Sequence, residues 1–390
     1  MTWERKTLDK LGTTSRGRSK HRPRNDASLF GGKYPFIQTA DVKNANFYIT
    51  EYEQTYNEKG LAQSKLWPVG TLCITIAANI ADTGILGIEA CFPDSVMGFL
   101  PYEGVSDARF VKYCFDILQQ ECKQISQGTA QDNLSWEKLS TVTFPAPPFE
   151  VQRKIADILS AYDDLIENNK KQIKLLEEAA QRLYKEWFVD LRFPGHENVP
   201  VVDGVPEGWS IEALSSIADV VMGQSPKSEF YNQNGEGLPF HQGVGSYGNR
   251  FVIDSTFTTS FTRIAPKGSI LFSVRAPVGR LNLTQNKIVI GRGLAAINDK
   301  RGFQSFLFYM LKERFFKDDI IGNGSIFASI SKDELLNQKF ILANVALIEK
   351  FNTLASEIDE RLSALDKQIV LLSKTRDRLL PKLMSGEIKV

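Results

Sequence analysis

The stretch with the most specific chemical meaning is Ala146-Pro147-Pro148-Phe149, which matches part of a catalytic signature. Enzymes that methylate the amino group of adenine carry Asn or Asp, then Pro-Pro, then Tyr or Phe. Their Asn or Asp accepts hydrogen bonds from the adenine amino group, and the methyl group of Ala146 cannot accept one. We therefore expect these prolines to end a strand and precede a helix, because proline cannot continue a helix through itself.

Other patterns of catalytic residue types are also incomplete. Gly243 to Gly248 fits GxGxxG, but NRFVID follows it instead of a helix, so loop glycines are a better interpretation than a dinucleotide site. The sequence has no GxxxxGK[ST] phosphate loop. The three histidines, His21, His196 and His241, have no triad or metal context, and the four cysteines form no CxxC pair. We expect no catalytic residue and no metal site in this chain.

The chain consists of two copies of one unit. KQIKLL at 171–176 returns as KQIVLL at 367–372, an offset of 196 residues (367 − 171), and the same offset pairs Phe144 with Phe340. The stretch equivalent to the two prolines and Phe149 is then 343–345, Ala-Asn-Val, which contains no proline. A duplicate that lacks the motif is a further argument against methyl-transfer chemistry. The repeat is far longer than a solenoid unit, which indicates domain duplication.

Each copy combines short β-rich runs, such as GTLCITIA at 70–77, with helical stretches, such as 107–120, and ends in a long helix. We expect an α+β fold with an internal pseudo-twofold repeat. The Pro- and Gly-rich junction between the copies marks a linker. The predicted boundaries are 1–149 for the first globular domain, 150–190 for the first long helix, 191–208 for the linker, 209–345 for the second globular domain and 346–390 for the second long helix.

Heptad spacing of apolar residues predicts a seam along each long helix. We expect the two helices to pack as an antiparallel coiled coil; burial of each seam against a globular domain is the alternative. Asn169, a polar seam residue, is of the kind that sets register or orientation. The predicted seam residues are Ile155, Leu159, Tyr162, Ile166, Asn169, Ile173, Leu176, Leu183, Phe351, Ile358, Leu362, Leu365, Ile369, Leu372 and Leu379.

The composition of the chain indicates its cellular environment but does not decide whether it binds nucleic acid. The formal net charge of +1 gives no global sign of nucleic-acid binding and does not exclude a local basic patch. The beginning of the sequence does not resemble a signal peptide, and no apolar run is long enough to span a membrane. We expect a cytoplasmic protein without a membrane partner.

At this point the residues resemble a known family, the DNA specificity subunits of Type I restriction–modification systems. The resemblance is carried by EVQRKIADILSAYDDLIENN at 150–169, LYKEWFVDLRFPG at 183–195 and VPEGW at 205–209. SVRAPVGR at 273–280 and PFHQG at 239–243 also resemble that family. The resemblance covers essentially the whole chain.

The resemblance implies two target recognition domains that read the two halves of a split, asymmetric site in double-stranded DNA. It implies that the helix pair separates the domains and docks two methyltransferase subunits, with restriction–translocase subunits in the full complex. The chain itself is then a non-catalytic subunit without cofactors. S-adenosylmethionine for adenine methylation, and ATP and Mg for translocation and cleavage, belong to the partners.

The side chains that we expect to contact DNA begin with a basic run, RGRSKHRPR at 16–24, in an otherwise neutral chain; a solvated loop is the alternative. Arginine suits guanine edges and glutamine suits adenine. Arg275, within SVRAP, is equally suited to tie a loop. The candidate DNA contacts are Arg16, Arg18, Lys20, Arg22, Arg24, Gln38, Gln224, Lys227, His241, Gln242, Arg250 and Arg275.

Two other functions remain open from the residues alone. One is a self-contained adenine methyltransferase, which the incomplete motif at 146–149 disfavours. The other is a coiled-coil scaffold without a DNA role. Binding of S-adenosylmethionine would indicate the first, and absence of salt-dependent DNA binding would indicate the second.

Overall fold

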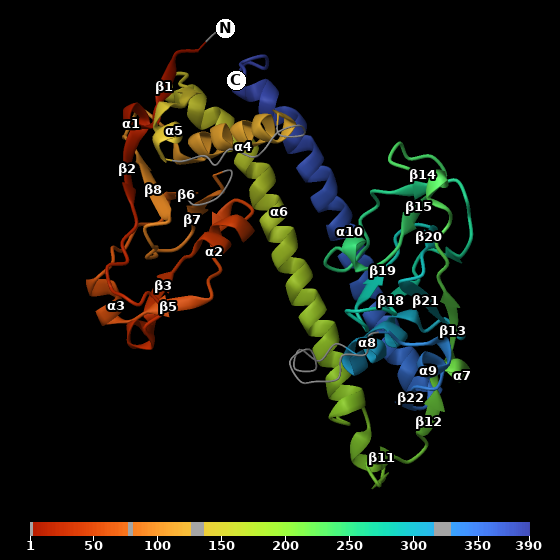
Figure 1. The fold of residues 1–390 in the computed structure, drawn as a ribbon. Coiled ribbons are helices and arrows are strands. Elements are labelled where there is room, and N and C mark those ends of the chain that lie inside the picture. Colours follow the sequence, from red (N-terminus) through yellow and green to blue (C-terminus); the bar gives the residue numbers. More distant parts are fainter. Residues whose placement is uncertain (1–2, 77–80, 126–135, 316–328) are drawn as a thin grey trace. The chain divides into compact units, whose positions relative to one another are not determined.

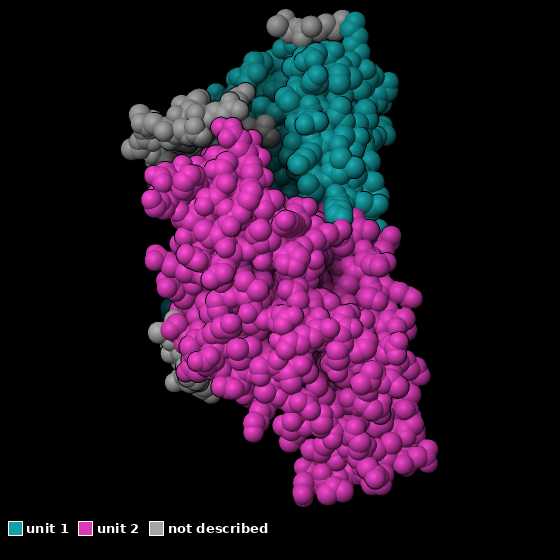
Figure 2. Space-filling model, turned by 90° about the vertical axis from the view of Figure 1, so that its right-hand side faces the viewer, with its two compact units in different colours: residues 1–171, 367–390 teal, residues 172–366 magenta. Residues whose placement is uncertain are grey.

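The computed structural model describes residues 3–76, 81–125, 136–315 and 329–390 (Figure 1). It forms two compact units, which Figure 2 colours separately. Unit 1 comprises Met1–Lys171 and Lys367–Val390, and unit 2 comprises Gln172–Asp366. Each unit therefore contains one globular part and a segment of each long helix. The boundaries predicted from the sequence instead treat each long helix as one undivided region.

Unit 1 contains a five-stranded sheet in the order β2-β8-β6-β7-β4 and the two-stranded ladders β1-β9 and β3-β5. Its globular elements are β1 (Arg5–Thr7), α1 (Leu8–Leu11), β2 (Gly12–Arg16), β3 (Phe30–Phe36), α2 (Thr39–Asn44), β4 (Tyr48–Ile49), β5 (Gln54–Tyr56), α3 (Glu58–Ala62), β6 (Leu72–Thr75), β7 (Thr83–Leu86), β8 (Val96–Pro101), α4 (Ala108–Ile125), α5 (Trp136–Thr141) and β9 (Thr143–Pro145). Alternation along β6 directs Leu72 and Ile74 into the core that contains α4, and Cys73 into a second core around Trp67.

Unit 2 contains a four-stranded sheet, β13-β21-β18-β19, a five-stranded sheet, β14-β16-β15-β20-β17, and the ladders β12-β22 and β10-β11. Its globular elements are β10 (Val201–Val202), β11 (Val205–Pro206), β12 (Ser210–Ala213), α7 (Leu214–Ile217), β13 (Ala218–Met222), β14 (Tyr231–Asn232), β15 (Leu238–His241), β16 (Phe257–Thr258), β17 (Ile264–Ala265), β18 (Ile270–Ser273), β19 (Leu281–Leu283), β20 (Ile288–Ile290), β21 (Leu294–Asp299), α8 (Gln304–Phe315), α9 (Lys332–Leu336) and β22 (Lys339–Leu342).

The strand registers repeat between the two units residue by residue. Lys6 pairs with Phe144 between β1 and β9, and Glu212 pairs with Phe340 between β12 and β22. The second pair lies 206 and 196 positions after the first (212 − 6 and 340 − 144). The order strand, short helix, strand that opens unit 1 as β1-α1-β2 returns as β12-α7-β13. The internal repeat and the α+β fold predicted from the sequence are therefore confirmed.

The first long helix, α6 (Phe149–Tyr184, 36 residues), begins directly after the two prolines. The buried Gln152 fixes this start: its Nε2 donates to the carbonyl oxygens of Pro147 (2.9 Å) and Val105 (3.0 Å). Phe149 lies under the Arg153 guanidinium, 5.9 Å from the ring centroid. In this structure the proline motif therefore joins a domain to a helix. A π-turn, Lys185–Val189, ends α6.

The second long helix, α10 (Val345–Met384, 40 residues), begins after Asn344, whose side chain accepts a hydrogen bond from the Leu347 backbone (2.9 Å). It runs antiparallel to α6. In unit 1, Asp163 contacts Arg376, and Asn169 Nδ2 donates to Gln368 Oε1 (3.3 Å), so the partner number falls as the α6 number rises. Asn169 thus has a polar partner on α10.

None of the predicted seam residues is exposed. Seven of them are buried, and the other eight are half-buried. The buried ones are Ile155, Leu159, Ile166, Asn169, Phe351, Leu362 and Leu365. Near the helix starts the seam packs into the globular cores, Ile155 with Phe115 in unit 1 and Phe351 with Phe306 in unit 2. Helix pairing and burial against a domain both contribute.

Each long helix carries one aspartate that binds a buried tyrosine of its own unit. In unit 1 the Tyr113 hydroxyl donates to Asp163, and in unit 2 the Tyr309 hydroxyl donates to Asp359 (3.0 Å). These pairs are related by the 196-residue offset, but their cations are not. Arg376 of α10 supplies the cation in unit 1, whereas Arg250, from a loop of the globular part, supplies it in unit 2.

The side chain of Asp163 is only 2% exposed, and burial raises its pKa, while Arg376 and the Tyr113 hydroxyl oppose that rise. The folded-state pKa therefore lies above the value of the unfolded chain. The contribution of this group to stability is fully present below about pH 4 and is lost as the pH rises through the folded pKa. At neutral pH Arg376 offsets part of that loss.

We predict that Arg376→Met lowers the free energy of unfolding by about 3 kcal/mol at pH 7, because it leaves a buried carboxylate without its cation. The loss should shrink as the pH approaches 4, because a protonated Asp163 needs no cation. Urea unfolding measured at both pH values tests this.

Arg378→Met, a change at an exposed position of the same helix, is the matched control. Equal effects of the two substitutions at pH 7 would show that Arg376 does not stabilise the buried carboxylate.

Candidate nucleic-acid interface

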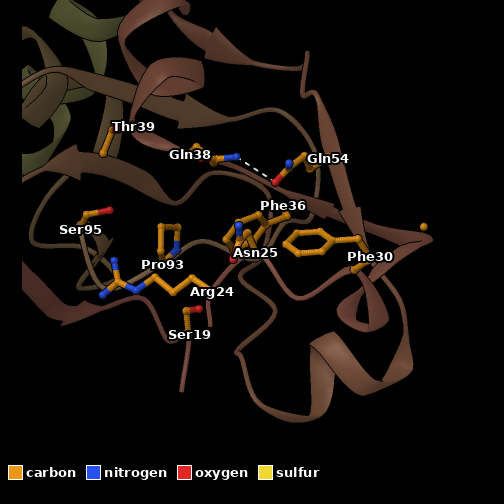
Figure 3. A pocket seen from close by; sticks show the side chains of 12 residues that line it. Ser19, Arg24, Asn25, Phe30, Phe36, Gln38, Thr39, Gln54, Pro93 and Ser95 are labelled. Carbon is orange, nitrogen blue, oxygen red and sulfur yellow. Dashed lines mark hydrogen bonds between the residues drawn. The ribbon is translucent and has the colours of Figure 1, made fainter. Parts of the chain in front are cut away.

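Unit 1 has a hollow of about 670 Å³ beside the end of β3 (Figure 3). It lies where the chain leaves β2, where β3 ends and where the loop that precedes β8 ends. Its lining combines amides, hydroxyls, one arginine and two aromatic rings. The lining residues are Ser19, Arg24, Asn25, Ala27, Phe30, Gly31, Phe36, Gln38, Thr39, Gln54, Pro93 and Ser95.

Two glutamines stand together at this hollow. Phe36 of β3 pairs with Gln54 of β5, and this register brings Gln54 beside Gln38, which follows β3. Gln38 Nε2 donates to Gln54 Oε1 at 2.9 Å (Figure 3). The Phe36 ring stacks on Tyr56 with centroids 4.1 Å apart and supports the strand pair from inside. Gln54 was not a candidate from sequence, because only the strand register reveals its neighbour.

The basic run divides into free cations and cations that hold the loop. Arg16, Arg18 and Lys20 are exposed, and no acidic partner is found for them among the described residues. Arg22 Nη1 instead donates to the carbonyls of Ser19 (2.6 Å) and His21 (2.8 Å). The Arg24 Nη2 donates to both carboxylate oxygens of Asp94, at 2.8 Å each.

Unit 2 has a smaller hollow, about 260 Å³, at the equivalent place of the repeat. The equivalence follows from the backbone: Arg18 N donates to Phe92 O (3.0 Å) in unit 1, and Gln224 N donates to Ile290 O (2.9 Å) in unit 2. Gln242 lines this hollow as its counterpart Gln38 lines the other. The lining residues are Gln242, Gly243, Val244, Ser273, Arg275, Ala276, Arg292 and Gly293.

Arg292 is an exposed lining residue that the sequence analysis missed. Two glycines flank it, and both pack on the backbone of Gln242. A Cβ atom at Gly291 would lie 2.9 Å from the Gln242 Cα, and one at Gly293 would lie 2.4 Å from the Gln242 carbonyl oxygen. Only glycine fits at these two positions. The Gly-Arg-Gly stretch was a signal available in the sequence.

The other candidates of unit 2 divide into exposed and buried side chains. Gln224, Lys227, Gln242 and Arg275 are exposed. His241 is only 1% exposed, and its two ring nitrogens lie 2.8 Å from Ser246 Oγ and 2.9 Å from Asp254 Oδ1. Burial would raise the pKa of Asp254, but hydrogen bonds from His241 and Asn286 hold it below its usual value.

Arg250 is likewise buried, with 3% of its side chain exposed. Its guanidinium bridges the two long helices within unit 2, 3.3 Å from Glu177 of α6 and in contact with Asp359 of α10. It also lies over the Phe308 ring, 4.5 Å from the centroid. The structure thus places His241 and Arg250 inside the unit, where both ring nitrogens of His241 and both Nη atoms of Arg250 have internal partners. We therefore do not retain them as base-reading candidates.

The GxGxxG stretch follows β15 in a loop of unit 2. Residues Gly243 to Gly248 form a short 3₁₀ turn (Val244–Ser246) and a β-bridge, not a helix that could hold a phosphate. Within the described ranges no three His, Cys, Asp or Glu side chains gather as they would around a metal ion. No described helix is long and apolar enough to cross a membrane.

Comparisons with known proteins agree on one family. The family model "Type I restriction modification DNA specificity domain" matches residues 1–178 and 206–380. The Type I restriction enzyme MjaIX specificity subunit of Methanocaldococcus jannaschii is 28% identical over 409 residues, 100% of this chain and 94% of that protein. The HindI specificity subunit of Haemophilus influenzae is 24% identical over 331 residues, 65% and 71% of the two proteins. The crystal structure of the Type I S subunit from M. genitalium has the same fold, with a TM-score of 0.64, 17% identity and coverage of 98% and 96%.

We predict that replacing Arg16, Arg18 and Lys20 together by alanine weakens binding of the full chain to duplex DNA. The slope of log K against log salt should fall in magnitude by up to about 3, because each phosphate contact contributes roughly 0.9. Titrations across a series of salt concentrations measure this slope.

A triple alanine variant at the exposed Lys10, Lys43 and Lys154 changes the net charge equally and serves as the control. An unchanged slope in the first variant would make the basic run a solvated loop.

Proposed function

The chain belongs to the Type I restriction–modification DNA specificity family, and from this premise we propose how its two units share recognition. As a specificity subunit it binds DNA by sequence and acts with partner subunits of a restriction–modification system. In our proposal unit 1 reads one half of a split site and unit 2 reads the other. The helix pair α6 and α10 sets the number of unread base pairs between them.

The single observation that carries this proposal is the pair of equivalent hollows with different linings. The same backbone hydrogen bonds frame both, those of Arg18 and Gln224. Their polar side chains differ: an amide pair in unit 1, and Arg275 and Arg292 in unit 2. Equal frames with unequal linings suit two readers of two different sequences, so the recognised site need not be palindromic.

The exposed apolar residues of the long helices favour the binding of two copies of one partner. Ile158 and Leu354, 196 residues apart, are 38% and 41% exposed, and Leu175 and Leu371, at the same offset, are 65% and 66% exposed. Large apolar side chains exposed in equal pairs indicate two equivalent contact places. We propose that a methyltransferase subunit docks at each. Restriction–translocase subunits would join these in the full complex.

The chemistry would then lie in the partners. The position before Pro147 is alanine, and the prolines border a helix start held by Gln152. We propose that S-adenosylmethionine binds the methyltransferase subunits and that ATP and Mg bind the translocase subunits. A self-contained methyltransferase is the other candidate, and tight binding of S-adenosylmethionine by the isolated chain would support it instead.

Expression with the cognate methyltransferase subunit, followed by genome-wide mapping of N6-methyladenine, tests the function. We predict a split motif: two short defined half-sites around an undefined gap. Exchange of residues 1–149 for a foreign recognition domain should change one half-site and leave the other. A change in both half-sites would contradict the division of labour between the units.

The spacer role gives a separate prediction. A seven-residue insertion in each long helix, between Lys171 and Gln172 and between Asp366 and Lys367, adds about 10 Å at 1.5 Å per residue. At 3.4 Å per base pair we expect the gap to grow by about 3 base pairs. Methylation mapping measures the gap directly.

The bases of both half-sites should stay unchanged in this variant, which is its internal control. A methylated motif with the original gap would show that the length of the helix pair does not set the distance between the half-sites.

A further inference from the structure

The two hollows differ in charge at one equivalent position. Phe92 and Ile290 accept equivalent backbone hydrogen bonds, and the residues two positions later are Asp94 in unit 1 and Arg292 in unit 2. An acidic residue in one copy therefore corresponds to a basic residue in the other, on the same backbone frame. This difference in charge alters which chemical groups each hollow can bind.

In unit 1 the acidic residue at this position, Asp94, leaves the hollow without a free charge. Arg24 is its one charged lining residue among those described, and Arg24 Nη2 is held by both oxygens of Asp94. Its other polar side chains are amides and hydroxyls, which carry no charge. Since Gln38 Nε2 donates to Gln54 Oε1, the pair still offers a donor at Gln54 Nε2 and an acceptor at Gln38 Oε1. Adenine presents the matching acceptor N7 and donor N6 side by side in the major groove.

In unit 2 the equivalent position is Arg292, and the guanidinium groups of Arg275 and Arg292 have no acidic partner among the described residues. Both arginines are exposed, and no described lining residue of this hollow is acidic. Arg292 is held between glycines that pack on Gln242, so its backbone position is fixed against that residue. Guanine presents two acceptors, O6 and N7, which the arginine fork contacts in bidentate fashion.

We infer that the hollow of unit 2 selects a guanine through Arg292 and Arg275, whereas the hollow of unit 1 selects an adenine through Gln38 and Gln54. This inference rests on the proposed function and specifies it further, because it names the base class that each unit prefers. The half-site read by unit 2 therefore contains a G·C pair that depends on these arginines. The half-site read by unit 1 contains an A·T pair that depends on the glutamines.

The test uses Arg292→Lys in the full chain, expressed with the cognate methyltransferase subunit, and maps N6-methyladenine across the genome. Lysine keeps the positive charge for a phosphate but loses the planar fork that discriminates guanine. Arg292→Ala removes both. Exchange of residues 1–149 identifies which half-site belongs to unit 2.

We expect Arg292→Lys to keep the gap and the other half-site while preference for guanine at one position falls about tenfold or more. Gln54→Ala should relax one adenine position in the half-site of unit 1 and leave that of unit 2 intact. Each variant is thus a control for the other. Arg301→Lys, beyond the far end of β21 from the hollow, should leave the motif unchanged.

Different failures identify different errors. No split motif in the wild type would overturn the proposed function itself. A split motif with no G·C pair in the half-site of unit 2, or an unchanged motif in Arg292→Lys while Arg292→Ala lowers methylation evenly at all sites, would overturn the guanine assignment and make Arg292 a phosphate contact. An unchanged half-site in Gln54→Ala would overturn the adenine assignment.

Discussion

The arrangement of either unit depends on the contact between an aspartate of a long helix, buried in unit 1 and half-buried in unit 2, and a buried tyrosine. Asp163 and Asp359 each bind a tyrosine from the globular part, so the recognition domain and the helix are fixed to one another at that point. A buried carboxylate stabilises this contact only while its charge has a partner. Arg376 and Arg250 supply it from different parts of the chain. The two units thus share the aspartate and the tyrosine of the repeat, but their arginines come from different elements.

On this scaffold the recognition surfaces vary without disturbing the frame. The hydrogen bonds that shape both hollows come from main-chain atoms, such as Arg18 N and Gln224 N. Main-chain bonds do not depend on the side chain at a position, so Asp94 and Arg292 occupy the same place with opposite charge. The strand ladders and cores stabilise each unit, whereas the side chains to which we assign specificity are a few exposed ones.

Much of the architecture could be predicted because it depends on local pattern. The heptads of α6 and α10 and the 196-residue offset are visible in the sequence, and the matched registers of Lys6 and Glu212 confirm the repeat. The individual contacts were harder to predict. Gln54 becomes a neighbour of Gln38 only through strand pairing. His241 and Arg250 look like surface residues by type, but tertiary partners bury them.

The composition of the units has a consequence for the order of folding during synthesis. Unit 2 is one continuous segment, whereas the core of unit 1 includes Leu380, Leu383 and Met384, and Trp3 lies against Gly386 near the other terminus (Figure 1). The core that contains Leu8 and Leu11 is therefore complete only after the segment with Leu380 and Leu383 has been made. Domains usually fold from the N-terminus onward during synthesis. Here unit 2, which is encoded between the two segments of unit 1, can complete its core first, and unit 1 is complete only when residues 367–390 join residues 1–171.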